Sequence, residues 1–109
     1  MENTFSKKII IFGQDRCPLC KRMDNGMKAT MYDFLANNCD YEYVNLSELS
    51  AEEKAKVVEL YQLTSTPTTL VIDGNVTKER FNGFVEVYKL YQVVNKLWFH
   101  GWCKWLRLV

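Results

Sequence analysis

Residues 7–20 read KKIIIFGQDRCPLC. The uninterrupted apolar run at residues 9–12 predicts a central strand that is buried on both faces. Cys17 and Cys20 follow this run, separated by two residues, and a segment of helical periodicity begins directly after Cys17. Two cysteines at this spacing at the start of a helix can form a disulfide with little backbone movement. The stretch therefore predicts a redox-active pair.

The expected helix start favours a thiolate at Cys17. The free N–H groups and the positive dipole end of a helix lower the pKa of a thiol placed there. Arg16 and Lys21 flank the pair with positive charge, and Pro18 suits the first helical turn, where its missing N–H costs nothing. Because the thiolate is the species that attacks a disulfide, we expect Cys17 to attack and Cys20 to resolve the mixed disulfide.

A cysteine pair at this spacing is also typical of half a zinc site. His100 and Cys103 would complete a set of three cysteines and one histidine. The strand-then-helix context favours redox chemistry, so we expect no metal and keep a zinc-binding module as the alternative.

The bulk properties indicate a single domain spanning residues 1–109. Fourteen Lys and Arg against thirteen Asp and Glu give a formal net charge of +1, which argues against nucleic acid as the main partner. Four cysteines, without a signal peptide or an apolar stretch of about twenty residues, favour a reducing cytoplasmic location.

The rest of the chain predicts alternating strands and helices. Ser50 and Glu53 form a capping box that opens a helix, and Asp73-Gly74-Asn75 tolerates the positive φ values of a hairpin turn. The predicted elements after the first strand are a helix over residues 18–36, a strand over 41–46, a helix from 50 to about 62, a hairpin of 68–72 with 76–81, and a helix over 87–98.

This βαβαββα order resembles the thioredoxin fold and, within it, the glutaredoxin-like branch. Two motifs carry the resemblance: Cys17-Pro18-Leu19-Cys20 after the first strand and Thr66-Pro67-Thr68-Thr69 before the third. It covers residues 7–97 and implies an α/β domain with a four-stranded mixed sheet flanked by helices. It also implies a cis peptide bond before Pro67, which leaves the backbone of Thr66 free to pair with an extended substrate.

The residues around the cysteines select the branch. Thioredoxins usually carry a Trp before the first cysteine, Gly-Pro between the cysteines and a buried acid in the first strand. Here Arg16, Pro18-Leu19 and an all-apolar strand stand in those places, whereas the glutaredoxin pattern Cys-Pro-aromatic-Cys differs only at Leu19. The resemblance implies a thiol-disulfide oxidoreductase with no bound cofactor, which draws electrons from glutathione or from thioredoxin reductase and NADPH.

The resemblance also implies where the substrate binds. The turn Asn82-Gly83-Phe84-Val85-Glu86 stands where glutaredoxins have the Gly-Gly-x-Asp turn of their glutathione site. We expect disulfide-containing proteins or small thiols as partners, and a monomer. The expected substrate-binding residues are Arg16, Pro18, Leu19, Thr66, Pro67, Gly83 and Phe84.

Residues 98–109 form an aromatic and basic extension that contains all three tryptophans. As a helix it would suit a membrane interface or a partner surface, but we favour the alternative that it folds back onto the domain, which accounts for the aromatics without a ligand. A non-enzymatic adaptor acting through this extension is the third hypothesis. Cys39 is expected to be a small buried residue rather than a regulatory thiol.

Overall fold

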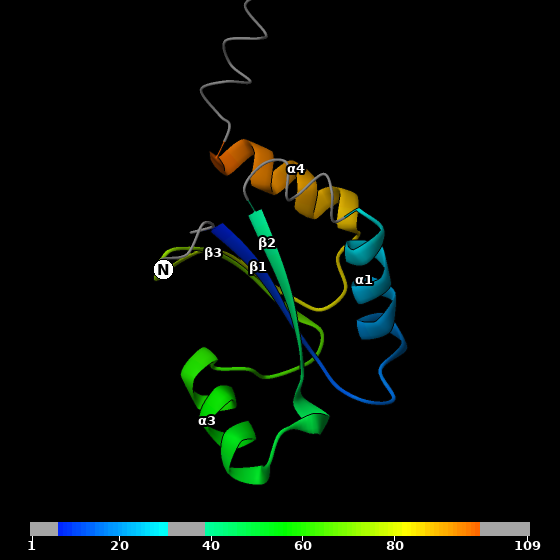
Figure 1. Ribbon diagram of the computed structural model, residues 1–109, viewed down its shortest axis with the longest axis vertical. Helices are drawn as coiled ribbons and strands as arrows, with labels where there is room; N and C mark the ends of the chain where they lie inside the picture. The colour runs from blue at the N-terminus through cyan, green and yellow to red at the C-terminus, as the bar shows by residue number, and fades with distance from the viewer. Residues whose placement is uncertain (1–6, 31–38, 99–109) are drawn as a thin grey trace, which may run out of the picture.

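A computed structural model describes residues 7–30 and 39–98 and shows a sheet with helices on both faces (Figure 1). The predicted succession of strands and helices is confirmed, with one short 3₁₀ helix added. In chain order the elements are β1 (Lys7–Gly13), α1 (Pro18–Ala29), β2 (Cys39–Asn45), η1 (Leu46–Glu48), α3 (Ala51–Tyr61), β3 (Thr68–Asp73), β4 (Val76–Asn82) and α4 (Val87–Trp98).

The sheet has four strands in the order β2-β1-β3-β4 and is mixed, as predicted. β1 runs parallel to β2 and antiparallel to β3, and β3 and β4 form the expected hairpin, which turns at Gly74 with a φ of 65°. The last five residues of β1 are all buried, because helices cover both faces of this central strand. The buried central strand predicted from the apolar run is therefore confirmed.

Alternation along the central strands divides the core in two. Ile9 and Ile11 face α1 and α4, where they pack with Met23, Met27 and Leu90. The intervening residues of β1 face α3: Ile10 and Phe12 pack with Leu46, Leu63 and Leu70, with side chains of α3 against them. Figure 1 shows the two layers, with α1 and α4 on one side of the sheet and α3 on the other.

The helix ends are set by local hydrogen bonds. The Ser50 side chain accepts from the Glu53 N–H and the Glu53 side chain accepts from the Ser50 N–H, so the capping box of α3 is confirmed. Gln62 ends that helix in the left-handed conformation, with a φ of 53°. α1 ends at Ala29, earlier than the predicted residue 36, and Thr30 is its C-cap, with its hydroxyl donating to the Gly26 carbonyl across 3.0 Å. The predicted helical residues 31–36 lie outside the described segments.

The second strand is shifted from its predicted bounds, since Cys39 begins β2 and Leu46 belongs to η1. Over residues 7–30 and 39–98, no helix is both long and apolar enough to cross a membrane. The aromatic extension beyond Trp98 lies outside this range.

Candidate active site

Cys17 is the N-cap of α1 and Pro18 occupies its first turn. The backbone N–H of Cys20 donates a hydrogen bond of 3.1 Å to the Cys17 Sγ, and the first turn contains no acidic residue. The two cysteines form a disulfide whose Cα atoms are 5.2 Å apart, a separation typical of disulfides. The predicted pairing of sulfur with an unpaired helix N–H is thus present in the structure.

The two sulfurs differ in access. Cys17 is half-buried, whereas Cys20 is 0 % exposed beneath it. Leu19 between them is 46 % exposed, and Arg16 precedes them in an exposed position with a φ of 60°. An incoming disulfide can therefore reach Cys17 but not Cys20.

The loop before β3 lies beside the cysteine loop. Pairing of Phe12 with Thr68 brings the residues after β1 next to those before β3, and Gln14 Nε2 donates to Thr66 Oγ1 across 3.0 Å. The Thr66–Pro67 bond is cis, as the family resemblance implied. The Thr66 side chain therefore lies beside the loop that precedes Cys17.

Two further predicted binding residues lie next to these loops. The N–H of Gly83, which has a φ of 100°, donates to the Pro67 carbonyl across 2.8 Å. The Phe84 ring lies 5.1 Å from the Arg22 guanidinium carbon, and Arg22 also approaches the Glu86 carboxylate at 3.7 Å. These contacts join the turn before α4 to the loop before β3 and to α1.

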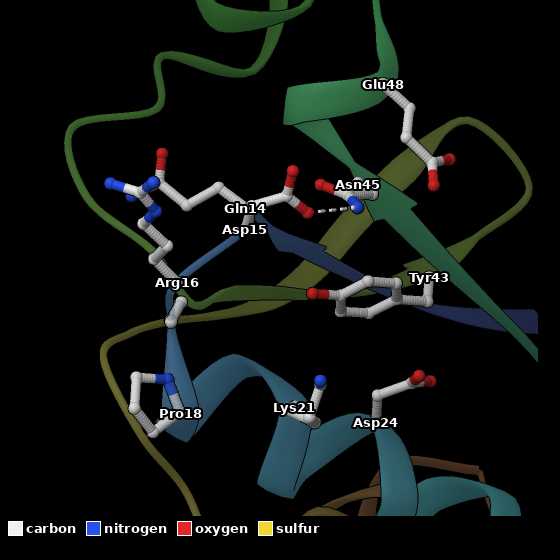
Figure 2. A pocket seen from close by; sticks show the side chains of 10 residues that line it. Gln14, Asp15, Arg16, Pro18, Lys21, Asp24, Tyr43, Asn45 and Glu48 are labelled. Atoms are coloured by element: carbon white, nitrogen blue, oxygen red, sulfur yellow. Dashed lines mark hydrogen bonds between the residues drawn. The ribbon is translucent and has the colours of Figure 1, made fainter.

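A pocket of about 850 Å³ opens on the other side of Cys17, toward β2 and η1 (Figure 2). Arg16 and Pro18, two of the predicted substrate-binding residues, line this pocket, whereas Thr66 and Pro67 do not. Figure 2 shows Tyr43 extending from β2 into this pocket, with Lys21 and Asp24 of α1 beneath its ring. The pocket is lined by Gln14, Asp15, Arg16, Cys17, Pro18, Lys21, Asp24, Tyr43, Asn45 and Glu48.

Hydrogen bonds and burial shape the pocket wall. Asn45 Nδ2 donates to Asp15 Oδ1 across 3.1 Å, and Tyr41 Oη donates to Asp24 Oδ1 across 2.6 Å. Burial, followed by the hydrogen bond to Asp24 and the charge of that carboxylate, raises the pKa of Tyr41. Burial and then the charges of Asp24, Asp15 and Glu48 raise the pKa of Tyr43. Both phenols therefore stay protonated and can donate hydrogen bonds.

The predicted site residues did not include Asp24, Tyr43, Asn45 or Glu48. Asp24 could have been predicted from the sequence, because it stands four residues after Cys20 on a predicted helix and therefore on the same helix face. The other three come from β2 and η1, and only the pairing of β2 with β1 brings them to Cys17.

Of the remaining cysteines, Cys39 is free and 0 % exposed, as predicted for a buried small residue. Burial, with the Asp40 charge, raises the pKa of Cys39 from 9.0 to about 12, and Lys7 opposes this. His100 and Cys103 of the zinc alternative lie outside the described residues. Within residues 7–30 and 39–98, no group of three potential metal ligands occurs.

A family model described as a thioredoxin-like domain matches residues 2–98. No curated protein sequence matches the chain.

The fold is similar to that of several solved structures. Thioredoxin O2 from Arabidopsis thaliana, in its oxidised state, matches at 17 % identity with a TM-score of 0.69, over 84 % of this chain and 75 % of its own. Thioredoxin-2 of the malaria parasite matches at 18 % identity with a TM-score of 0.71, over 88 % of this chain and 85 % of its own. The germline-specific thioredoxin Deadhead from Drosophila melanogaster matches at 21 % identity with a TM-score of 0.67, over 84 % of this chain and 81 % of its own. These likenesses confirm the thioredoxin-like fold.

The fold and the cysteine pair together indicate a thiol-disulfide oxidoreductase. The pair sits where β1 gives way to α1, its outer sulfur is accessible and its inner sulfur is buried. Such an arrangement can accept an electron pair from a dithiol or deliver one to a disulfide.

Proposed function

Because the chain belongs to the thioredoxin-like domain family, we propose that it is a dithiol reductase of disulfides, with glutaredoxin-like active-site chemistry. One observation supports this most directly: the accessible Cys17 Sγ accepts the N–H at the start of α1, and Cys20 lies buried within disulfide range. The positive end of the helix stabilises a thiolate at Cys17 and so makes it the attacking group.

The reaction proceeds in two exchanges. The Cys17 thiolate attacks one sulfur of the substrate disulfide, the S–S bond of the substrate breaks, and the other substrate sulfur leaves as a thiolate. Cys20 then attacks Cys17 Sγ, which releases the second substrate sulfur and leaves the Cys17–Cys20 disulfide. The substrate gains two electrons, and the protein loses them. Glutathione, or thioredoxin reductase with NADPH, supplies the electrons that restore the dithiol.

The substrate groove runs along Thr66, Pro67 and Gly83. β3 begins at Thr68, so the main chain of Thr66 lies outside the sheet ladder. An extended segment of a disulfide-containing protein can pair with this backbone as an added strand does. The exposed Leu19 offers an apolar contact beside Cys17, and Arg16, Pro18 and Phe84 border the groove. The proposal includes small disulfides as alternative substrates, a monomeric state and a cytoplasmic location.

The active-site chemistry is tested by reduction of insulin disulfides with dithiothreitol as the electron source. We expect Cys17→Ser to abolish catalysis. Cys20→Ser should instead retain the first exchange and accumulate a mixed disulfide on Cys17, which mass spectrometry detects. Cys39→Ala is the matched control and should keep its activity, because Cys39 is buried away from the pair. Undiminished turnover by Cys17→Ser would refute the proposal.

The glutaredoxin-like class is tested separately with the oxidised protein. We expect glutathione to reduce the Cys17–Cys20 disulfide at least as fast as thioredoxin reductase with NADPH. A marked preference for the reductase would place the protein with thioredoxins in its choice of electron source and would reject the glutaredoxin-like part of the proposal.

A further inference from the structure

The pocket of about 850 Å³ beside Cys17 has the size of a small-molecule site, since ligand pockets in proteins typically enclose about 300–1,000 Å³. Cys17 is half-buried and lines this pocket, so a molecule held there meets the attacking sulfur directly. The proposed function assigns this space no substrate. What the pocket accepts follows from the charges that its walls leave unpaired.

Only the outer of the two sulfurs is open to this pocket. Cys20 is 0 % exposed and is not among the lining residues. A Cβ placed on Gly13 would overlap the Tyr43 hydroxyl and would lie 2.9 Å from the Cys20 Cβ, so the Tyr43 hydroxyl and Cys20 meet at Gly13. A ligand in the pocket therefore contacts Cys17 and not Cys20.

Two unpaired cations lie at the cysteine end of the pocket. Arg16 directly precedes Cys17, and Lys21 follows Cys17 by four residues, about one turn of α1. Both side chains are exposed, and neither makes a hydrogen bond or an ion pair with another described residue. The positive end of the α1 dipole adds to their field. These groups favour a ligand that brings a carboxylate close to its sulfur.

The wall formed by η1 carries an unpaired negative charge. Figure 2 shows Glu48 and Lys21 on opposite sides of the Tyr43 ring. Glu48 is exposed, and its carboxylate has no hydrogen-bond or ion-pair partner within the described segments. The other two carboxylates of the pocket are already engaged, because Asp15 accepts from an Asn45 amide across 3.1 Å and Asp24 accepts from a tyrosine hydroxyl across 2.6 Å. Glu48 is therefore the carboxylate left for a cation on the ligand.

We propose that this pocket binds a small disulfide of the α-amino-acid type, such as cystine, whose carboxylates contact Arg16 and Lys21 and whose ammonium groups contact Glu48. The inference rests on the proposed function and names a substrate class for it. Cystine fits because each half carries both charges on the carbon next to the one that bears its sulfur. A ligand with one sign of charge leaves either the two cations or Glu48 unpaired.

The reaction in the pocket balances as two exchanges. The Cys17 thiolate attacks one sulfur of cystine, the S–S bond of cystine breaks, and one cysteine leaves as a thiolate that solvent protonates. Cys20 then gives up its proton to solvent and attacks Cys17 Sγ, and the second cysteine leaves as a thiolate that solvent protonates. Cystine gains two electrons and becomes two cysteines, while the dithiol of the protein becomes the Cys17–Cys20 disulfide.

The test compares four small disulfides in single turnovers of the reduced full-length protein, with acid quenching, alkylation and peptide mapping of Cys17 and Cys20. Cystine carries carboxylates and ammonium groups, cystamine lacks the carboxylates, dithiodipropionate lacks the ammonium groups, and hydroxyethyl disulfide is uncharged. Because the leaving thiols differ in reactivity, each rate constant is divided by that of the same disulfide with dithiothreitol. We expect the corrected rate constant of cystine to exceed the other three at least about fivefold, as paired charges at a surface allow.

Two variants separate the two recognition contacts. Lys21→Gln should lower the ratio of cystine to cystamine at least about threefold, because it removes a carboxylate contact, and should keep the ratio of cystine to dithiodipropionate within about twofold. Glu48→Gln should have the reverse effect on the two ratios. Any change in the ionisation of Cys17 acts on all four disulfides and cancels in these ratios. Lys54→Gln and Glu59→Gln remove the same charges at exposed positions of α3 outside the pocket, and they should keep both ratios.

The outcomes separate this inference from the proposed function. The inference is wrong if the corrected rate constants of the four disulfides are alike, or if cystamine or dithiodipropionate reacts fastest. It is also wrong if Lys54→Gln lowers the ratio of cystine to cystamine as much as Lys21→Gln does. In each of these cases, oxidation of Cys17 by the uncharged disulfide still supports the proposed function. If neither the small disulfides nor insulin oxidises Cys17, the proposed function itself fails.

Discussion

Thr68 and Thr69 are adjacent residues of β3 and both are fully buried, but their hydroxyls have opposite surroundings. Thr68 Oγ1 donates to the Ser65 carbonyl across 2.7 Å, whereas Thr69 Oγ1 has no hydrogen-bond partner among the described residues. A buried polar atom without a partner loses its hydration and gains nothing in return.

This difference predicts opposite effects of one substitution. Valine has nearly the shape of threonine, so Thr69→Val should raise the free energy of unfolding by about 1 kcal/mol, and Thr68→Val should lower it by about 1 kcal/mol. Urea unfolding of the two variants, each beside the unsubstituted protein, measures both changes. Equal shifts in the same direction would contradict the assignment of the Thr68 hydrogen bond.

The access of each sulfur predicts an order of alkylation in the reduced protein. Iodoacetamide near neutral pH should modify Cys17 first, because it is the half-buried sulfur at the helix start. Cys39 should react at least about a hundredfold more slowly, because it is 0 % exposed and its pKa is raised to about 12. Peptide mapping over time gives the rates. Modification of Cys39 before Cys17 would contradict the assignment of Cys17 as the accessible, reactive thiol.

Much of the fold could be predicted because its signals are local in sequence. The apolar run of residues 9–12 requires cover on both faces, and β1 is indeed central. The side chains of Ser50 and Glu53 each accept a hydrogen bond from the other's backbone N–H, so these two residues alone predict the start of α3. The Cys17 cap depends on the same kind of local geometry.

The pocket could not be predicted, because tertiary contacts build it. Tyr43 reaches the cysteines only because Ile11 pairs with it in the parallel register of β1 and β2. The period of the apolar residues likewise predicted a longer first helix than α1, which ends at Ala29. Strand register and the exact ends of helices have weak sequence signals.

The raised pKa of Cys39 predicts that the folded protein loses stability at alkaline pH. Its pKa is about 12 in the folded protein against 9.0 ordinarily, so above pH 9.0 the folded state binds more protons than the unfolded state. Stability from this group is complete below that pH and falls as pH rises toward 12, by at most about 1.4 kcal/mol per pH unit. Tyr41, whose pKa is also raised, adds to the fall at higher pH.

The measurement is denaturant unfolding of the oxidised protein at several pH values, since the Cys17–Cys20 disulfide does not titrate. Cys39→Ala should flatten the decline that begins near pH 9, whatever its effect on absolute stability. An identical slope in the variant would show that Cys39 is not the group responsible.

Arg80 of β4 binds the C-terminal end of α3 to the sheet. Its Nη1 donates to the Tyr61 carbonyl and its Nη2 to the Gln62 carbonyl, each across 2.6 Å, at the C-terminal end of a helix that has no basic residue in its last turn. The cation thus satisfies free carbonyls and opposes the negative end of the helix dipole.

Arg80→Ala should lower the free energy of unfolding by about 2 kcal/mol and speed amide exchange in α3, and Arg80→Lys should recover part of both. Lys78→Ala, at an exposed position of the same strand, should change stability by less than about 0.5 kcal/mol. If the two alanine variants unfold alike, the packing of the partly buried Val57, Val58 and Tyr61 holds α3 and the guanidinium does not.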